Sequence, residues 1–571
     1  MINVYNLNME LTCGPFTLLY QNGFIRSVKY GDLEILRMIY FALRDENWGT
    51  IPLRVFDENI KRTKNGFSIR CSAVSNREGE QLVRWHVAID GSENGSIVYA
   101  IEGEVLADIK KNRAGFCVLH PLKETIDQPV ILTHPDGNRS EGIFPRYIAP
   151  EDPFKEITEM KWRIDGNWFN LQFDGDIFET EDQRNWSDAS FKTFCTPLRL
   201  PFPVQMKKGD RISQRISFSV DSPLSYKATE NQIRISSTDT IRKLPEIGIG
   251  SSPSEEFTEK IFTVFMGLRL GHYRIDVDLS NIEWEDIFNN DVMIGQRLEL
   301  PFEIVIHLPQ DPRDELDRFV NLHREERIPA KKVTLLSKGE LTTREHHTSF
   351  IHLLRDLFPG TQIGIGTDFN FTELNRHRMD KDGADYVTFA LDPQEHATDD
   401  FTIIENTEAQ YYGVISAFQL YNIPVHVSPV LLKRKYNPYA TDPAALIVPE
   451  EDRNDERQQT QFCALWTLGS LKALASSKAE AVTYFQAVGP NGIVSAEGES
   501  FPVYDVFKML ADENFSFFFE TVSSSPLKVD GLCHEDGHVL IWNYTNSNQN
   551  VFIEPLNRAL TLTPYAIDVV R

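Results

Sequence analysis

The feature that most constrains this chain is a change of rhythm near residue 240, where short apolar strands begin to alternate with helix-length amphipathic segments. This alternation is typical of β/α units around a parallel sheet. Eight units that end in a return to strand favour closure into a barrel. The expected strands are EIGIG from Glu246, HYRIDVDL from His272, PFEIVIHL from Pro301, KKVTLL from Lys331, QIGIGTD from Gln362, DYVTFALD from Asp385, PVHVSPV from Pro424 and EAVTYFQAV from Glu480.

Helix-length segments with plausible caps fit between most of these strands. The second unit is the weakest, because WEDIFNNDVMIGQRL is short and poorly periodic. A doubly wound open sheet is the alternative architecture. The expected helices are SEEFTEKIFTVFMGLRL, PRDELDRFVNLHREER, TTREHHTSFIHLLRDLF, NTEAQYYGVISAFQLYN and TQFCALWTLGSLKALASS.

The two ends of the chain have a different pattern, in which short alternating runs such as LVRWHVAID and HVLIWNYTN are separated by turn residues. Such alternation is typical of antiparallel sheets with one buried face. We therefore expect an α/β plus β protein of three domains. Residues 1–230 form an N-terminal β-sandwich, residues 240–490 a catalytic (β/α)8 TIM-like barrel, and residues 491–571 a small C-terminal β-sandwich.

Charge and composition exclude several classes of partner. With 83 acidic and 58 basic residues the formal net charge is −25, which repels nucleic acid and anionic membrane surfaces. The first residues lack a basic and apolar leader pattern, and no run of 18 apolar residues occurs, so we expect a cytoplasmic protein without a membrane partner. Six scattered cysteines without CxxC spacing predict neither a zinc knuckle nor a disulfide framework. The oligomeric state stays open.

Polar residues at the carboxyl ends of barrel strands are candidates for chemistry. The fifth expected strand has the densest group, because GTDFNFTELNR leaves the barrel with two carboxylates, two amides and a guanidinium. The alternative makes Thr372 a helix N-cap before a solvated acidic turn. This segment supplies Asp368, Glu373, Asn375 and Arg376.

Other strand ends add further candidates. In RIDVDL the side chains of Arg274 and Asp276 share one face, as active-site groups or as a structural ion pair. The motif DPQEH after the sixth strand suits acid–base work, although a solvated loop is the alternative. The motif RNWSDASFKTF offers an indole for stacking on a sugar, or is an ordinary exposed loop. The candidates from these and the remaining strand ends are Lys338, Asp392, Glu395, His396, His426, Gln486, Trp186 and Asp188.

Several common catalytic motifs are missing from the sequence, namely GxSxG, HExxH, GxxxxGK[ST] and a helix-opening GxGxxG. A retaining glycosidase barrel of the commonest type needs carboxylates after its fourth and seventh strands, about 5 Å apart. Glu340 would serve as the first, but the seventh strand, HVSPV, offers no second. Ordinary glycoside hydrolysis is therefore disfavoured.

A family resemblance rests on a series of motifs in a fixed order. These are NWSDASFKTF, GTDFNFTELNR, DPQEHATDD, PVHVSPVLLKRKYNP and WTLGSLKALA followed by VTYFQAVGPNG. In this order they make the chain resemble the D-apionate lactonases of bacterial apiose catabolism, from about residue 180 into the last domain. The resemblance implies a hydrolase that opens the five-membered lactone of apionic acid. The family pattern places a carboxylate on the eighth strand, where this chain has Gln486.

Lactone opening needs an activated water, a site for the developing oxyanion and a proton for the leaving alkoxide. We expect Glu373 or Asp368 as general base and His396 as proton donor or oxyanion partner. Arg274 or Lys338 would receive the carbonyl oxygen. Asn375, Asp276, His426 and Gln486 would hold hydroxyls, with Arg376, Asp392, Glu395, Trp186 and Asp188 as further binding residues.

We expect no cofactor and no metal, because no run of ligands demands an ion. Two alternatives stay open. One is a divergent glycosidase that uses a carboxylate pair such as Glu373 with Asp368 or Asp392. The other is a non-catalytic carbohydrate-binding protein in which Trp186 dominates.

Overall fold

The computed structural model describes residues 9–221, 232–326, 328–439 and 446–571. The chain divides into two compact units. The first holds residues 1–183 and 189–229, and the second holds residues 184–188 and 230–571. The domain boundary expected near residue 230 falls in the 222–231 segment, outside the described residues.

The first unit contains two nine-stranded antiparallel sheets, as its alternating pattern predicts. Rings from the two sheets meet in a shared core, where Phe41 lies 5.1 Å from Trp85 and Tyr99 lies 4.9 Å from Phe116. The predicted N-terminal β-sandwich is therefore confirmed. One sheet contains β1 (Met9–Cys13), β2 (Phe16–Gln21), β3 (Phe24–Tyr30), β4 (Leu33–Asp45), β9 (Ile109–Pro121), β12 (Phe154–Ile157), β15 (Phe178–Asp182), β16 (Ser190–Phe194) and β17 (Val204–Met206). The other contains β5 (Leu53–Arg62), β6 (Phe67–Arg77), β7 (Glu80–Gly91), β8 (Ser96–Val105), β10 (Pro129–Thr133), β11 (Arg139–Ile143), β13 (Glu159–Ile164), β14 (Asn167–Asp174) and β18 (Arg211–Val220).

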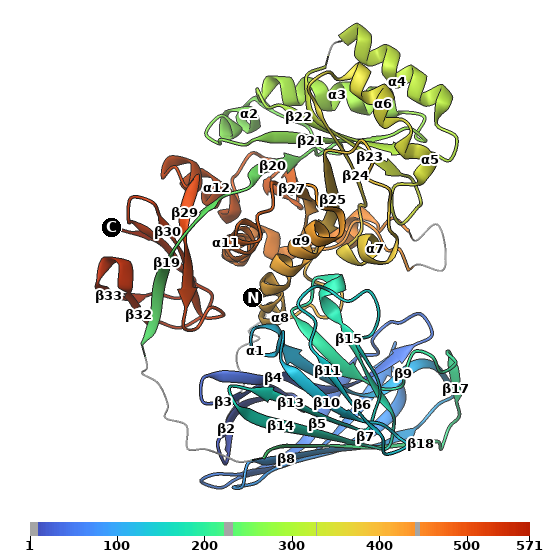
Figure 1. Ribbon diagram of the computed structural model, residues 1–571, viewed down its shortest axis with the longest axis vertical. Helices are drawn as coiled ribbons and strands as arrows, with labels where there is room; N and C mark the ends of the chain where they lie inside the picture. Colours follow the sequence, from blue (N-terminus) through green and yellow to red (C-terminus); the bar gives the residue numbers. More distant parts are fainter. Residues whose placement is uncertain (1–8, 222–231, 327, 440–445) are drawn as a thin grey trace. The chain divides into compact units, whose positions relative to one another are not determined.

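The second unit is built around a closed parallel barrel, which confirms the predicted (β/α)8 fold and excludes the open sheet (Figure 1). Each strand pairs with the next, and the first pairs with the eighth. The barrel strands are β20 (Glu246–Gly250), β21 (His272–Asp278), β22 (Phe302–Leu308), β23 (Ala330–Ser337), β24 (Gln362–Gly366), β25 (Tyr386–Leu391), β26 (Val425–Val430) and β27 (Ala481–Val488). A short β28 (Gly492–Val494) extends the last of them.

The helices around the barrel follow the predicted order. The segment expected to be weakest forms a full 14-residue helix, α3, because its apolar residues face the barrel. The segment TTREHHTSFIHLLRDLF is broken into two short helices. The helices are α2 (Glu259–Phe265), α3 (Trp284–Arg297), α4 (Arg313–Glu326), α5 (Glu345–Thr348), α6 (Ile351–Leu357), α7 (Phe371–Arg376), α8 (Asp400–Glu405), α9 (Thr407–Tyr421), α10 (Glu450–Arg453), α11 (Gln461–Ser476) and α12 (Pro502–Asp512). In the described residues no helix has the length and apolar character needed to cross a membrane.

The C-terminal strands form one seven-stranded sheet rather than the two layers expected. A strand that precedes the barrel in sequence, β19 (Ile233–Lys243), lies in the middle of it. The sheet curls, so that Leu562 and Val570 near its opposite edges share one apolar cluster and no second layer is needed to cover that core. Its other strands are β29 (Phe517–Ser523), β30 (Val529–His534), β31 (Val539–Asn543), β32 (Gln549–Ile553), β33 (Arg558–Leu562) and β34 (Ile567–Val570).

Candidate active site

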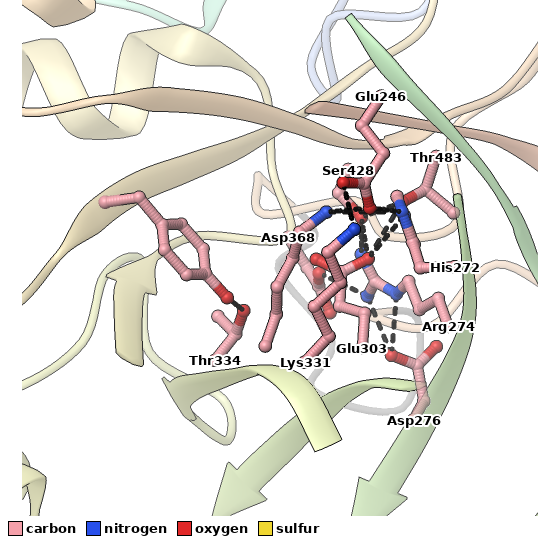
Figure 2. A network of polar contacts seen from close by, with 12 residues as sticks. Glu246, His272, Arg274, Asp276, Glu303, Lys331, Thr334, Asp368, Ser428 and Thr483 are labelled. Carbon is pink, nitrogen blue, oxygen red and sulfur yellow. Dashed lines mark hydrogen bonds and ion pairs between the residues drawn. The ribbon is translucent and has the colours of Figure 1, made fainter. Parts of the chain in front are cut away.

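A buried network of polar side chains fills the lower barrel and supports the site above it (Figure 2). His272, fully buried on β21, contacts Glu246 at 2.9 Å and Thr483 at 2.8 Å. Thr483 donates to Glu303 at 2.8 Å, and Lys332 donates to Glu246 at 3.0 Å. Burial raises the pKa of the Glu303 carboxyl, but the charges around it hold that pKa well below its usual range. The negative and positive side chains of the network therefore compensate one another.

Arg274 lies two residues after His272 on β21. Because side chains of a strand alternate between its two faces, both residues lie on the same face. Its guanidinium donates to Asp276 at 2.7 Å, to Asp368 at 2.9 Å and to Ser428 at 2.9 Å. Lys435 completes the group, with its ammonium 2.8 Å from Asp276. Arg274 is therefore a fixed centre that orients two carboxylates, and the structural ion pair considered from RIDVDL is present.

These carboxylates also approach a histidine. His307 Nε2 lies 3.4 Å from Asp368 and 3.6 Å from Asp276. The three residues bring potential metal-ligand atoms within 4.8 Å of one another. The guanidinium of Arg274 and the ammonium of Lys435 contact the same carboxylates and already compensate their charge.

Two pockets open at the carboxyl ends of the barrel strands and share Pro429, Leu431 and Lys435 in their walls. The first has an empty volume of about 410 Å³ and the second about 590 Å³, both including space open to solvent. The site residues in the first pocket are Trp186, Asp368, Glu373, Asp392, Glu395 and Tyr439. Those in the second are Arg274, Asp276 and Gln486.

Glu373 lies in the first helical turn after β24 but is buried, with 2% of its side chain exposed. Tyr439 donates to its Oε1 at 2.9 Å, and His377 Nε2 lies 3.4 Å from its Oε2. Burial raises the pKa of this carboxyl, against the opposing effect of Tyr439 and nearby cations. The alternative of a solvated turn capped by Thr372 is wrong, because Asn370 takes the N-cap position and Thr372 is fully buried.

A second carboxyl with a raised pKa faces the same pocket. Burial, reinforced by the charge of Glu395, raises the pKa of Asp392 well above its usual value. Asn370 lies between the two acids and donates to Glu395 at 3.0 Å and to Asp392 at 3.3 Å. Arg434 donates a charge-assisted hydrogen bond to Glu395 at 2.7 Å.

The wall beside Glu373 is aromatic. The indole of Trp186 donates to Tyr439 at 3.1 Å, and the Arg376 guanidinium lies 4.9 Å from the centre of the indole ring. His396 packs edge-on to Trp186 and contacts Asp188 at 2.5 Å through Nδ1. Trp186 and Asp188 belong to the 184–188 segment, which groups with the barrel although its flanking residues group with the first unit.

Comparison with known proteins bears on this arrangement. The family model for the D-apionate lactonase N-terminal domain matches residues 4–223, and the model for the D-apionate lactonase TIM barrel domain matches residues 248–514. The chain belongs to the D-apionate lactonase family. A D-apionate lactonase from Brucella anthropi is 26% identical over 599 aligned residues, which cover 98% of this chain and 96% of that protein. The family match supports an enzyme over a non-catalytic binding protein.

Solved structures with a similar arrangement are distant. A GH30 endoxylanase from Clostridium papyrosolvens has 8% sequence identity and a TM-score of 0.38, covering 57% of this chain and 88% of its own. A family 51 α-L-arabinofuranosidase from Bifidobacterium longum has 12% identity and a TM-score of 0.41, covering 60% and 95%. In this member of the lactonase family, the barrel assignment rests on the family match and on the strand pairings themselves.

Most of the residues expected at the site lie at or next to the two pockets of this lactonase-family barrel. Asn375 is behind the wall, where it donates to Asn185 at 3.0 Å. Lys338 forms an ion pair with Asp278, at the end of β21. Among the described residues, no contact links Lys338 to Arg274.

His426 is not brought to the site. It is the second residue of β26 and therefore lies near the amino ends of the strands, stacked on Tyr386 with ring centres 3.8 Å apart. Burial lowers the pKa of this imidazole. The expectation that His426 reaches the mouth of the barrel is wrong, because a strand pattern gives the face of a side chain but not its height along the barrel.

Four residues of the site were missed in the sequence. His307 stands next to last in β22, where the apolar run hides it. Arg434, Lys435 and Tyr439 lie in the segment after β26, which has no periodicity to place it. The cluster of basic and aromatic residues in LLKRKYNPY, directly after a strand end, was the signal that would have found them.

Proposed function

We propose that the chain hydrolyses a small sugar lactone, with D-apionolactone as the substrate that the family match suggests. Water adds to the lactone carbonyl, the ring C–O bond breaks, and the ring oxygen takes a proton to give the open hydroxy acid. The observation that carries the proposal is that Glu373, Asp392 and Lys435 line one pocket. They supply a base, an acid and a cation, which are the three functions that the reaction needs.

Glu373 is proposed as the general base. Its raised pKa makes it a better proton acceptor than an exposed carboxylate, while Tyr439 fixes one of its oxygens. Asp276, by contrast, has a pKa held well below its usual range by Arg274 and Lys435 despite its burial, so it is a poor base. Asp276 and Asp368 are therefore proposed to orient cations and substrate hydroxyls.

Asp392 is proposed to protonate the leaving ring oxygen. It is the buried acid of the pocket, and Glu395 beside it keeps its pKa high. Lys435 is proposed to receive the carbonyl oxygen, because its ammonium donates to Asp276 and has further N–H donors. The expected donor His396 becomes a positioning residue, since its Nδ1 is held by Asp188 and its ring supports Trp186.

The test is a panel of aldonolactones and branched-chain lactones incubated with the full chain, with proton release followed in weak buffer. We expect hydrolysis of a five-membered branched lactone well above the uncatalysed rate, and none of aryl glycosides. A parallel set with a chelator tests the cluster of Asp276, His307 and Asp368 as a metal site. Absence of lactone hydrolysis across the panel, or turnover of glycosides instead, would sink the proposal.

A further inference from the structure

A second group of convergent side chains lies far along the chain from the barrel site, in the hairpin between β30 and β31. The sequence there is HEDGH, from His534 to His538. The turn is closed by hydrogen bonds from His534 N to His538 O at 2.8 Å and from Gly537 N to His534 O at 2.9 Å. Gly537 has a φ of 101°, which favours glycine, and its turn lets the two imidazoles stack with centres 4.3 Å apart.

The inner nitrogens of both rings converge on one carboxylate oxygen. Oδ1 of Asp536 lies 2.8 Å from Nδ1 of His534 and 2.5 Å from Nδ1 of His538. The outer nitrogens face the residues that follow α12. Nε2 of His534 lies 3.2 Å from the carbonyl oxygen of Asn514, and Nε2 of His538 lies 3.7 Å from Glu513.

In the neutral imidazole, the hydrogen bonds of His534 leave its inner nitrogen without a proton. Its Nε2 then donates to the Asn514 carbonyl, and its Nδ1 accepts the backbone N–H of Asp536 at 3.2 Å. The same Nδ1 lies 2.8 Å from a carboxylate oxygen. Two acceptors at this distance repel each other unless a proton or a metal cation lies between them.

We propose that His534, Asp536 and His538 bind a divalent transition metal ion of the zinc class, with water in the remaining positions. Two imidazoles and a carboxylate are ligands that such ions prefer. Histidine ligands typically hold their outer nitrogen on a carbonyl or carboxylate. Asn514 provides such a partner for His534, and the Glu513 carboxylate lies near Nε2 of His538 at 3.7 Å. The exposed Asp536, with 63% of its side chain accessible, gives the ion an entry path.

Metal binding requires a small adjustment of the hairpin. Ligand atoms bonded at about 2.0 Å to a tetrahedral ion lie roughly 3.3 Å apart, so Asp536 moves outward by several tenths of an ångström. The ion then ties the β30–β31 hairpin, through His534 and His538, to the end of α12. Its role is to fasten the C-terminal sheet, and it is independent of lactone hydrolysis in the barrel.

The experiment uses the full chain freed of metal with a chelator and titrated with Zn²⁺ against a chromophoric zinc indicator. We expect Zn²⁺ to bind in the wild type and the affinity to fall more than about 100-fold in Asp536→Asn and in His538→Gln. Glu513→Gln, which changes a carboxylate near His538 that also pairs with Arg571, should weaken binding less, by about 10-fold. His352→Gln, at an exposed histidine on α6, is the matched control and leaves the affinity unchanged.

Thermal unfolding gives a second readout. Zn²⁺ should raise the unfolding temperature of the wild type and of His352→Gln but not that of Asp536→Asn. Asp536 is exposed, so its variant is expected to fold, and circular dichroism checks this. Equal zinc affinity in the wild type and Asp536→Asn overturns the proposal and assigns any bound ion to another site, such as the barrel cluster. No measurable zinc binding overturns it as well.

Discussion

At the scale of single residues, burial separates the carboxyls of the barrel mouth into two kinds. Asp276 is ionised by the cations that touch it, whereas Glu373 and Asp392 have raised pKa values because burial dominates their surroundings. Groups whose environments push their pKa values apart are typical of acid–base sites. The sequence alone does not indicate which of these carboxyls has a raised pKa and which has a lowered one.

Replacing Glu373 by Gln should lower kcat/KM by at least about 100-fold if the carboxylate accepts a proton in the transition state. The wild-type profile should fall on its acidic side as this group becomes protonated, above the pH expected for an ordinary glutamate because the pKa is raised. The variant should lose that acidic limb, which rate measurements across pH will show.

Glu340→Gln is the matched control, since Glu340 follows β23 and forms an ion pair with Arg344 away from both pockets. It should keep near-normal turnover. A well-folded Glu373→Gln enzyme with normal turnover would remove Glu373 from the base role.

Asp291 on α3 offers a test of buried charge. Burial raises its pKa to about 7, from 3.8, with a further increase from Asp276. Between these pH values the unfolded chain has released the proton that the folded chain keeps, so wild-type stability falls as pH rises from about 4 to 7. Asp291→Asn should therefore be more stable than the wild type at pH 8, by up to about 4 kcal/mol, and equal to it below pH 4.

Urea unfolding at several pH values measures this difference. Asp286→Asn, an exposed acid on the same helix, is the control and should show no such pH dependence. A constant difference between Asp291→Asn and the wild type from pH 4 to 8 would contradict the assignment.

At the scale of elements, β21, β22 and β23 support the site through buried side chains lower in the barrel. On β21 the order His272, Arg274, Asp276 runs from the closed interior toward the pocket. Lys332 on β23 and Glu303 on β22 balance the lowest of these residues. The polar interior thus fixes the position of Arg274, although burying these charges costs desolvation free energy.

Lys332→Met should destabilise the protein by about 3 kcal/mol, because it leaves buried carboxylates without their cation. Because the pKa of Glu303 is lower in the folded protein than in the unfolded chain, its ionised carboxylate stabilises the fold. This stabilisation is complete above pH 4.5, the pKa in the unfolded chain, and is lost as the pH falls through the pKa in the folded protein. The variant should show a smaller acid-dependent loss than the wild type. Chemical denaturation at pH 7 and pH 3.5 checks both statements.

The neighbouring Lys331 supplies the control. It pairs with the same Glu246 but has 43% of its side chain exposed, so Lys331→Met should cost less than about 1 kcal/mol. Equal costs for the two lysines would show that burial of Lys332 does not matter.

At the scale of the whole molecule, the second unit is discontinuous in sequence. Its pocket takes Trp186, and its loop network takes Asp188, from a segment that precedes the barrel by more than 40 residues. The C-terminal sheet is discontinuous as well, because β19 enters it from before the barrel.

A fragment of residues 230–571 should therefore fold but have low catalytic activity. We expect retained helical circular dichroism and a loss of at least about 10-fold in kcat/KM, since the pocket lacks its indole wall and substrate positioning weakens. The full-length double variant Trp186→Ala, Asp188→Asn should reproduce the loss. Full activity in the fragment would show that the segment is dispensable.

The barrel and the strand end with the most polar residues can be predicted from local sequence patterns. Periodicity is a local property, so the alternation of strand and helix and the position of Asp368 and Glu373 at the exit of β24 could be predicted from neighbouring residues. The lack of a carboxylate on HVSPV likewise stands in the sequence, because the identity of a residue needs no coordinates.

Which groups meet depends on contacts between segments that are distant in sequence. Lys435, Tyr439 and Trp186 reach the pocket from segments without periodicity, and closure of the chain over long sequence distances sets their contacts. The same closure places His426 near the amino end of its strand, away from the pockets. Burial and the summed field of neighbouring charges raise the pKa values of Glu373 and Asp392, and both effects depend on residues distant in sequence.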